Sequence, residues 1–309
     1  MKKFFKIVLC ALLAIILSIS CLVIIKSRQP LLKEGYAAKV ETGGPLEQKY
    51  IVDGPEAVSY REYPLLQPFK KYIVHYPTSL ESSSRRYPVI VVCNGSGTPA
   101  TKYKALQKHY ASWGFIVIGT EDKYSWYGFS GEMCVRHLEF LDSTATLENG
   151  EKNIFMGKID FDNVGITGHS QGGVGVFNTI SAREHKDIFK AAVALSPTQH
   201  TLAENLQWHY DVSGIKTPTL LLCGTTEGPF STPESLKENF DGFPATTPLV
   251  MATRDGVVHN DMLHVSDGYV TAWFLWLLKG DTEAGKAFTA ESPEFLSNNM
   301  YQNQTIRLE

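Results

Sequence analysis

The residues best suited to chemistry in this chain form a five-residue run, Gly168-His169-Ser170-Gln171-Gly172. This is the G-x-S-x-G pattern of a nucleophile elbow, a sharp turn between a strand and a helix with a serine at its tip. The flanking segments suit that setting, because residues 164–167 predict a buried strand and residues 172–183 predict a helix. Glycines on both sides of the serine leave room for neighbouring backbone at a tight turn. We therefore predict that Ser170 is a nucleophile exposed at the carboxyl edge of a sheet.

An acid and a base follow Ser170 in the order that this chemistry requires. Residues 219–223 predict a buried strand, and Glu227 comes just after it. The next predicted strand, residues 249–252, leads into a loop that contains His259. A serine hydroxyl attacks well only when an imidazole accepts its proton, and a carboxylate fixes the tautomer of that imidazole and stabilises its cation. Serine, acid and histidine in this chain order predict a catalytic triad.

Both partners of the serine have competitors in the sequence. Asp241 and Asp255 are the alternative acids, and His264 is the alternative base. His259 is favoured because it lies on the loop before the final predicted helix. His169, inside the elbow, is expected to pack or to form a hydrogen bond rather than to catalyse.

Acyl transfer also needs hydrogen-bond donors aimed at the oxyanion that develops on the attacked carbonyl. The backbone N–H of Gln171 is one candidate, since it follows the nucleophile at the start of a helix, where the dipole favours negative charge. The second candidate is the backbone N–H of Ser96, in the glycine-rich loop 94–97 that follows the predicted strand 89–93. We predict that these two groups form the oxyanion hole.

The elements needed to position these residues alternate along the chain. Apolar strands such as 89–93 and 219–223 are typical of strands covered on both faces, and their alternation with helices favours a mostly parallel sheet. No helix separates the first two strands, so they would form an antiparallel N-terminal edge. Strands are expected at residues 57–62, 71–76, 89–93, 115–119, 164–167, 191–195, 219–223 and 249–252, and helices at 101–112, 131–141, 172–183, 233–240 and 267–278. We predict an α/β fold with a mostly parallel eight-stranded sheet and helices on both faces.

Several of these segments carry a resemblance to a known superfamily. They are VIVVCNGSG (89–97), ASWGFIVIG (111–119), GITGHSQGG (165–173), TPTLLLCGTTE (217–227) and the segment 257–281. The chain from about residue 49 to 288 resembles the α/β-hydrolases, in particular their dienelactone-hydrolase-like and polyester-hydrolase-like esterases. The resemblance implies hydrolysis of carboxylic esters through an acyl-enzyme on Ser170, without a metal or an organic cofactor. The chain departs from the superfamily in having Asn94 where histidine is common, and Glu227 where aspartate is more usual.

The same resemblance bears on how substrate is bound. Only about two dozen residues separate the predicted strands 191–195 and 219–223, where many relatives insert a helical cap. We therefore expect little or no cap and an open, shallow site. Tyr124 and Trp126 follow a strand end and are expected to wall the substrate pocket, with Trp208 and Tyr210 as weaker candidates.

Composition excludes some classes of function. The formal net charge of −3 gives no electrostatic reason to expect a nucleic-acid partner. The sequence contains none of the common zinc or calcium motifs, so no metal site is predicted. The five cysteines do not form a disulfide framework and are interpreted as small buried apolar side chains.

The first 28 residues differ from the rest of the chain. Lys2, Lys3 and Lys6 precede an uncharged run of nineteen residues, 7–25. As a helix this run spans about 28 Å, close to the hydrocarbon thickness of a bilayer, about 30 Å. That length favours an uncleaved signal anchor over a cleaved signal peptide, although Ser18–Cys21 also loosely resembles a lipoprotein cleavage site. The lysines favour a cytoplasmic N-terminus.

We therefore divide the chain into a signal anchor or signal peptide (1–28), a linker (29–48) and an α/β-hydrolase domain (49–309). The domain is expected outside the cytoplasm, held at the cell membrane by a single-pass anchor or secreted after cleavage. The favoured function is a serine esterase that acts on a small-molecule or lipid-like ester. A peptidase or amidase on the same scaffold is the alternative, and a non-catalytic surface binding protein is the third.

Overall fold

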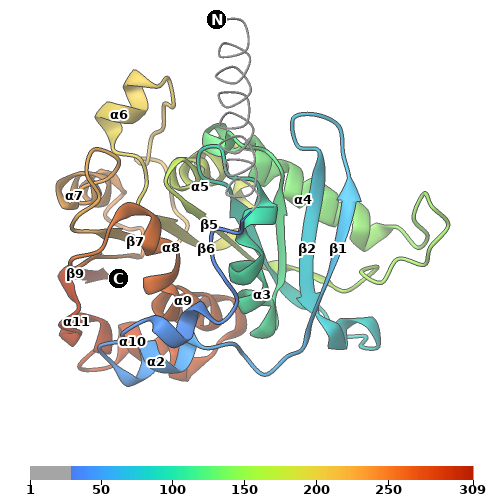
Figure 1. Ribbon diagram of the computed structural model, residues 1–309, viewed down its shortest axis with the longest axis horizontal. Helices are drawn as coiled ribbons and strands as arrows, with labels where there is room; N and C mark the ends of the chain where they lie inside the picture. The colour runs from blue at the N-terminus through green and yellow to red at the C-terminus, as the bar shows by residue number, and fades with distance from the viewer. Residues whose placement is uncertain (1–28, 309) are drawn as a thin grey trace, which may run out of the picture.

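The computed structural model of the protein describes residues 29–308, and Figure 1 shows a central sheet between two layers of helices. The nine strands lie in the order β1-β2-β4-β3-β5-β6-β7-β8-β9. Their bounds are β1 Val58–Pro64, β2 Lys71–Pro77, β3 Tyr87–Cys93, β4 Ile116–Thr120, β5 Ile159–His169, β6 Phe189–Leu195, β7 Thr219–Gly224, β8 Leu249–Arg254 and β9 Tyr301–Arg307. The six strands from β3 to β8 run parallel, and the remaining three pair antiparallel at the two edges. The predicted α/β-hydrolase fold is confirmed.

The helices cover both faces of this sheet, as the apolar strands require. Alternate residues of β3 belong to different cores, with Val89 and Val91 on one face and Ile90 and Val92 on the other. The first face packs against α4 Phe129–Ser143, α5 Gln171–Ala182 and α7 Pro233–Gly242, and the second against α2 Pro45–Ile51, α3 Lys104–Ser112, α9 Asp267–Lys279 and α10 Thr282–Thr289. Short helical turns occupy the loops: η1 Tyr36–Lys39, η2 Thr78–Glu81, η3 Ala100–Tyr103, η4 Ser125–Tyr127, η5 Lys186–Ile188, α6 His200–Asn205, η6 His259–Asp261, α8 Met262–Val265 and α11 Glu294–Ser297.

The sheet has one strand more than the eight predicted. β9 forms the edge next to β8 and pairs with it antiparallel. Its sequence, YQNQTIR, is too polar to indicate a buried strand, and only its first residue, Tyr301, is buried. The strand exists because the edge of β8 offers unpaired backbone groups, a driving force that the hydrophobic pattern does not reveal.

The segment 29–48, expected to be a linker, lies against the domain over part of its length. Leu32 is buried in the core that contains α3 and α9, and the Tyr36 hydroxyl donates a hydrogen bond to Asp267. Glu47, in α2, is fully buried, and its carboxylate forms an ion pair with Arg254 at the end of β8, with 2.9 Å between Oε1 and Nη1. Apolar burial and a buried ion pair therefore fix this segment to the sheet.

Two further predictions concern the cysteines and the N-terminal anchor. Cys93, Cys134 and Cys223 are buried free thiols, and burial raises the pKa of the Cys93 thiol to about 12. The predicted anchor, 1–28, lies outside the described residues. Within residues 29–308, no helix has both the length and the apolar character needed to cross a bilayer.

Substitution of His137 by phenylalanine is expected to make the domain more resistant to acid. Burial lowers the pKa of His137 to about 4, its Nε2 has no hydrogen-bond partner, and its ring stacks on Tyr72 at 4.0 Å. Between pH about 6.5 and 4 the unfolded chain binds one proton more at this site than the folded chain, so stability falls as the pH falls. Phenylalanine keeps the stacking and removes this difference.

We expect His137→Phe to reduce the loss of unfolding free energy between pH 7 and pH 5 by about 2 kcal/mol. Urea unfolding at both pH values measures this quantity. Equal losses in the variant and the unmodified protein would show that His137 is not the group responsible.

Candidate active site

Ser170 lies at the tip of a strained turn that joins β5 to α5. Its φ and ψ angles are 60° and −123°, a conformation that a residue with a side chain rarely adopts. The turn is held by hydrogen bonds, since the Ser170 N–H donates to the Leu195 carbonyl over 2.9 Å and the Ser170 carbonyl accepts from the N–H of Gly173. The side chain is half-buried. This is the geometry of a nucleophile elbow, as the pattern predicts.

The two glycines of the pattern are required by the packing of the turn. A Cβ atom on Gly168 would lie 2.3 Å from the carbonyl oxygen of Gly172. A Cβ atom on Gly172 would lie 2.3 Å from the carbonyl oxygen of Cys93, at the end of β3. Both clashes involve backbone, so no side-chain movement could relieve them.

Glu227 and His259 meet although 32 residues separate them. His259 Nδ1 lies 2.9 Å from Glu227 Oε2. The Glu227 carboxylate is fully buried, and its other oxygen accepts hydrogen bonds from the Ser196 hydroxyl and the Gly224 N–H. A buried carboxylate held at three points fixes the ring of His259 and favours the tautomer with its proton on Nδ1.

The alternative acids have other partners, and among the described residues the alternative base has no contact with Glu227. Asp241 forms an exposed ion pair with Lys237 on α7, and Asp255 is exposed and accepts a hydrogen bond from Thr225. His264 is partly buried, which lowers its pKa, and Glu227 is not among its contacts in the described part of the chain. The geometry therefore favours Glu227 and His259.

His169 connects the elbow to the loop that carries the candidate base. Its Nε2 donates to the backbone carbonyl of His259 over 2.8 Å, and the two rings lie 4.5 Å apart. Burial lowers the pKa of His169 to about 3, so the ring stays neutral at ordinary pH. This contact matches the hydrogen-bonding role predicted for His169.

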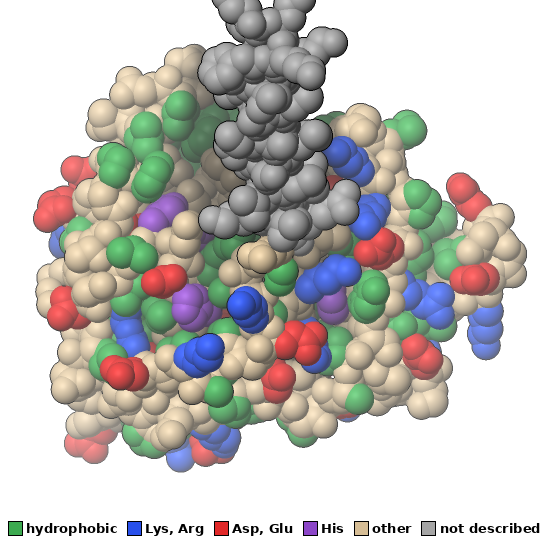
Figure 2. Space-filling view, in the orientation of Figure 1, with side chains coloured by type: hydrophobic (Ala, Val, Ile, Leu, Met, Phe, Trp, Pro, Cys, Tyr) green, Lys and Arg blue, Asp and Glu red, His purple; other side chains and the backbone are tan. Residues whose placement is uncertain are grey.

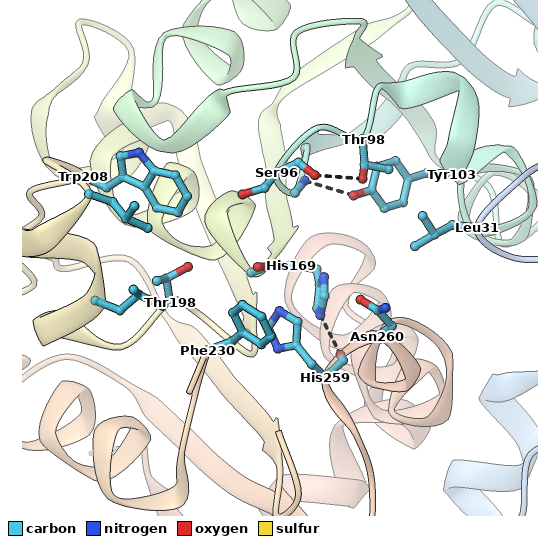
Figure 3. A pocket seen from close by; sticks show the side chains of 14 residues that line it. Leu31, Ser96, Thr98, Tyr103, His169, Thr198, Trp208, Phe230, His259 and Asn260 are labelled. Carbon is cyan, nitrogen blue, oxygen red and sulfur yellow. Dashed lines mark hydrogen bonds between the residues drawn. The ribbon is translucent and has the colours of Figure 1, made fainter. Parts of the chain in front are cut away.

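Ser170 and His259 open on the same cavity, of about 640 Å³ (Figure 3). Figure 3 shows Trp208 and Tyr103 on opposite sides of the cavity and Phe230 beside His259. The Phe230 ring lies 5.0 Å from the His259 ring. The other lining residues are Leu31, Gly95, Ser96, Thr98, His169, Thr198, Leu202, Leu206 and Asn260. A concave, largely apolar site of this volume suits a small organic ligand.

The predicted substrate wall differs from the observed one. Tyr124 and Trp126 do not line this cavity: Tyr124 is exposed, and Trp126 packs against the core beneath α5. The Trp126 carbonyl accepts a hydrogen bond from Asn178, which holds η4 down against α5. Of the weaker candidates, Trp208 lines the cavity, whereas Tyr210 is buried.

One candidate oxyanion donor directly follows Ser170 in the chain, and the other belongs to a residue that lines the same cavity. Ser96 lines the cavity, and Gln171 is the first residue of α5, where a backbone N–H has no acceptor within the helix. The side chain of Asn94 fixes the loop that contains Ser96. The Asn94 amide donates to the carbonyls of Thr120 and Asp122 over 2.6 Å each. The unusual asparagine thus ties the loops after β3 and β4 together.

Two residues of the site, Ser196 and Leu31, were not predicted from the sequence. Ser196, with φ of 44°, directly follows β6, and its hydroxyl donates a hydrogen bond to Glu227. Its position at the end of a strand is the sequence signal that could have indicated this role. Leu31 lies in the segment expected to be a linker, yet it lines the cavity, and its backbone N–H donates to the Lys102 carbonyl. Among the described residues, no cluster of three or more His, Cys, Asp or Glu side chains could hold a metal ion.

A mostly parallel sheet, helices on both faces and a serine at a strand-to-helix elbow together define an α/β-hydrolase. Comparison of the sequence with protein families is in agreement: the PET hydrolase-like family matches residues 50–277. The chain belongs to this family. The polyester-hydrolase-like resemblance seen in the sequence is thereby confirmed.

One characterised relative is the bis(hydroxyethyl) terephthalate hydrolase of Streptomyces coelicolor. The two sequences are 24% identical over 218 residues, which cover 68% of this chain and 62% of the relative. The chain thus spans less than two thirds of the length of that relative.

Proposed function

We propose that the protein is a serine hydrolase of carboxylic esters, with Ser170 as nucleophile, His259 as base and Glu227 as the acid that orients it. The observation that carries the proposal is the His259–Glu227 hydrogen bond of 2.9 Å beside the cavity that Ser170 lines. Family membership and the ester hydrolase among the relatives support the same reaction.

The proposed reaction has two halves. His259 Nε2 takes the proton from the Ser170 hydroxyl while the oxygen attacks the ester carbonyl carbon. The N–H groups of Ser96 and Gln171 stabilise the oxyanion, and the C–O bond to the alcohol then breaks as His259 returns the proton to the leaving oxygen. Water attacks the acyl-enzyme in the same way and releases the carboxylic acid and free Ser170.

A small ester is the substrate that the site favours. The cavity of about 640 Å³ has Tyr103, Trp208 and Phe230 in its lining, which suits an apolar or aromatic acyl group. Bis(hydroxyethyl) terephthalate, the compound named for the relative, combines an aromatic acid with small alcohols and is a suitable test compound.

We place the catalytic domain outside the cytoplasm, on an anchor formed by residues 1–28. The support is the uncharged run of nineteen residues behind three lysines. Intact mass spectrometry of the membrane-fraction protein tests this placement. A mass that lacks residues 1–28 would contradict retention of the anchor.

Hydrolysis of p-nitrophenyl acetate and butyrate by the full chain, compared with Ser170→Ala, tests the activity. We expect release of p-nitrophenol by the unmodified protein and a rate indistinguishable from background in the variant. Aminoacyl anilides run in parallel separate an esterase from a peptidase or amidase. Equal rates for the two proteins on every ester would overturn the proposal.

A further inference from the structure

Exposed large apolar side chains gather at one edge of the sheet, the carboxyl edge on which Ser170 lies. Of the twelve such side chains in the described residues, seven follow the carboxyl ends of strands or contact a loop that does. They are Leu31, Leu66, Tyr124, Phe129, Leu206, Phe230 and Val258, with exposed fractions from 39% to 83%. We call these seven residues the apolar rim. Three of the seven, Leu31, Leu206 and Phe230, line the cavity. Isolated apolar side chains on a surface are ordinary, but a concentration along one edge of the sheet indicates a surface that contacts something.

The topology explains why residues so far apart share this edge. β1 pairs antiparallel with β2, and β2 pairs antiparallel with β4, so β1 ends at the same edge as the parallel strands. The hairpin tip after β1 therefore carries Leu66, 83% exposed, to the level of the elbow. α6 and the residues after it bring Leu206 into the lining of the cavity, and Figure 1 shows α6 on the other side of the molecule from the β1–β2 hairpin. Figure 2 shows hydrophobic side chains over α6 on this side of the molecule.

The N-terminal part of the chain enters the domain at the same edge. Leu31 lines the cavity and is 40% exposed, and its N–H is bonded to the loop after β3. The uncharged run 7–25 ends only six residues before Leu31. At 3.3–3.6 Å per residue, a fully extended chain of that length reaches about 20 Å. An anchor in the bilayer would therefore hold the cavity within about 20 Å of the hydrocarbon core.

We propose that the apolar rim docks on the lipid bilayer and that Ser170 receives its ester from the membrane. The substrate class is an ester with an acyl chain or other apolar tail embedded in the bilayer. This inference rests on the proposed esterase function and on the proposed anchor, and it adds the partner surface and the route of entry.

The composition of the rim agrees with a lipid surface as the partner. Leucine and phenylalanine are among the residues that membrane-surface helices insert at the boundary between headgroups and acyl chains, and tyrosine is enriched at membrane–water interfaces. Lys70 and Lys123, both exposed, lie on the loops that carry Leu66 and Tyr124, where their amines can reach lipid headgroups. A polymer surface is the competing partner, and the experiment separates it because no polymer is present.

The experiment uses the full chain reconstituted in vesicles of dioleoylphosphatidylcholine. The vesicles carry 4-methylumbelliferyl oleate, either in the membrane that holds the protein (cis) or in separate protein-free vesicles (trans). p-Nitrophenyl butyrate in solution measures the active site itself. We expect hydrolysis of the oleate ester to be at least about tenfold faster in cis than in trans, because the anchor keeps the rim on its own membrane.

A linker variant tests the position of the rim directly. Twenty Gly/Ser residues inserted between Arg28 and Gln29 add a root-mean-square reach of about 25 Å and leave every described residue unchanged. We expect the cis rate to fall at least about fivefold, while the butyrate rate stays within twofold. The matched control carries the same insert after Gly150, an exposed loop residue with no atom within 4 Å of its Cβ position, and should keep the cis rate.

A point variant provides a second test. Leu66→Asp places a charge on the apolar rim away from the cavity lining, and Met156→Asp places one on an exposed residue before β5, at the opposite edge of the sheet. We expect a cis rate reduced about three- to tenfold for the first and unchanged for the second.

The outcomes separate this inference from the esterase proposal. If butyrate is not hydrolysed in a Ser170-dependent way, the proposed function fails. If butyrate is hydrolysed but cis and trans rates are equal, or neither the linker nor Leu66→Asp changes the cis rate, the esterase stands and docking of the rim on the bilayer is overturned.

Discussion

Replacement of His259 by alanine is expected to lower the turnover of p-nitrophenyl butyrate by about 10³- to 10⁶-fold, the range of triad deletions in other serine hydrolases. Among the described residues that line the cavity, His169 is the only other imidazole, and it is a poor substitute because burial lowers its pKa and its Nε2 is bonded to the His259 carbonyl. The expected loss appears in kcat, because the imidazole acts on the reacting atoms rather than on substrate binding.

The neighbouring histidine provides the matched control. His264→Ala removes an imidazole five residues away and is expected to change kcat less than about threefold. Ser196→Ala removes one of the three contacts of the Glu227 carboxylate and should lie between, with a loss of about 10- to 100-fold. If kcat fell strongly in His264→Ala but little in His259→Ala, the assignment of His259 as the base would be wrong.

Replacement of Arg254 by methionine is expected to lower the free energy of unfolding by about 3–5 kcal/mol. The variant leaves the Glu47 carboxylate fully buried without its cation, although Tyr301 and Asn298 still donate hydrogen bonds to it. It also removes the contact of the guanidinium with the Tyr301 ring, 4.6 Å away. Neutral hydrogen-bond donors cannot balance the negative charge of Glu47. The unfavourable free energy of burying that charge therefore destabilises the folded state.

Lys237→Met is the control, because its ion pair with Asp241 is exposed and is expected to contribute less than about 1 kcal/mol. Guanidinium chloride unfolding of both variants measures the difference. If the two losses were equal, the Glu47–Arg254 pair would carry no special weight in holding α2 against the sheet. The double variant Glu47→Gln/Arg254→Met should recover part of the stability, since it removes both charges.

The interior of the sheet was predictable from sequence because buried parallel strands are apolar throughout. Segments such as 89–93 and 219–223 lie in the sheet as expected, within one or two residues of their observed ends. β9 was not predictable in the same way, because its polar sequence forms a strand only through pairing with β8. The docking of segment 29–48 also depends on tertiary partners, above all the Glu47–Arg254 pair, that lie more than 200 residues away.

In the candidate site too, some features could be predicted from local sequence and others depend on tertiary contacts. Ser170, Glu227 and His259 could be proposed from the sequence as candidates because each follows a strand end, and parallel strands end at one edge. The walls of the cavity could not, since whether an aromatic residue after a strand faces the cavity depends on how its turn packs. Asn178 holds η4 through the Trp126 carbonyl while the Trp126 side chain packs against the core, whereas Trp208, after α6, lines the cavity.

The hydrogen bond from His169 to the His259 carbonyl has a consequence for how the site tolerates motion. β5 and β8, whose loops carry the serine and the imidazole, are three strand spacings apart, about 14 Å. A change in the twist of the sheet would ordinarily alter the distance between Ser170 and His259, because their strands are so far apart. The bond ties the imidazole loop to the turn of the serine itself, so we expect the distance between the two groups to change less than the distance between the strands when the sheet flexes.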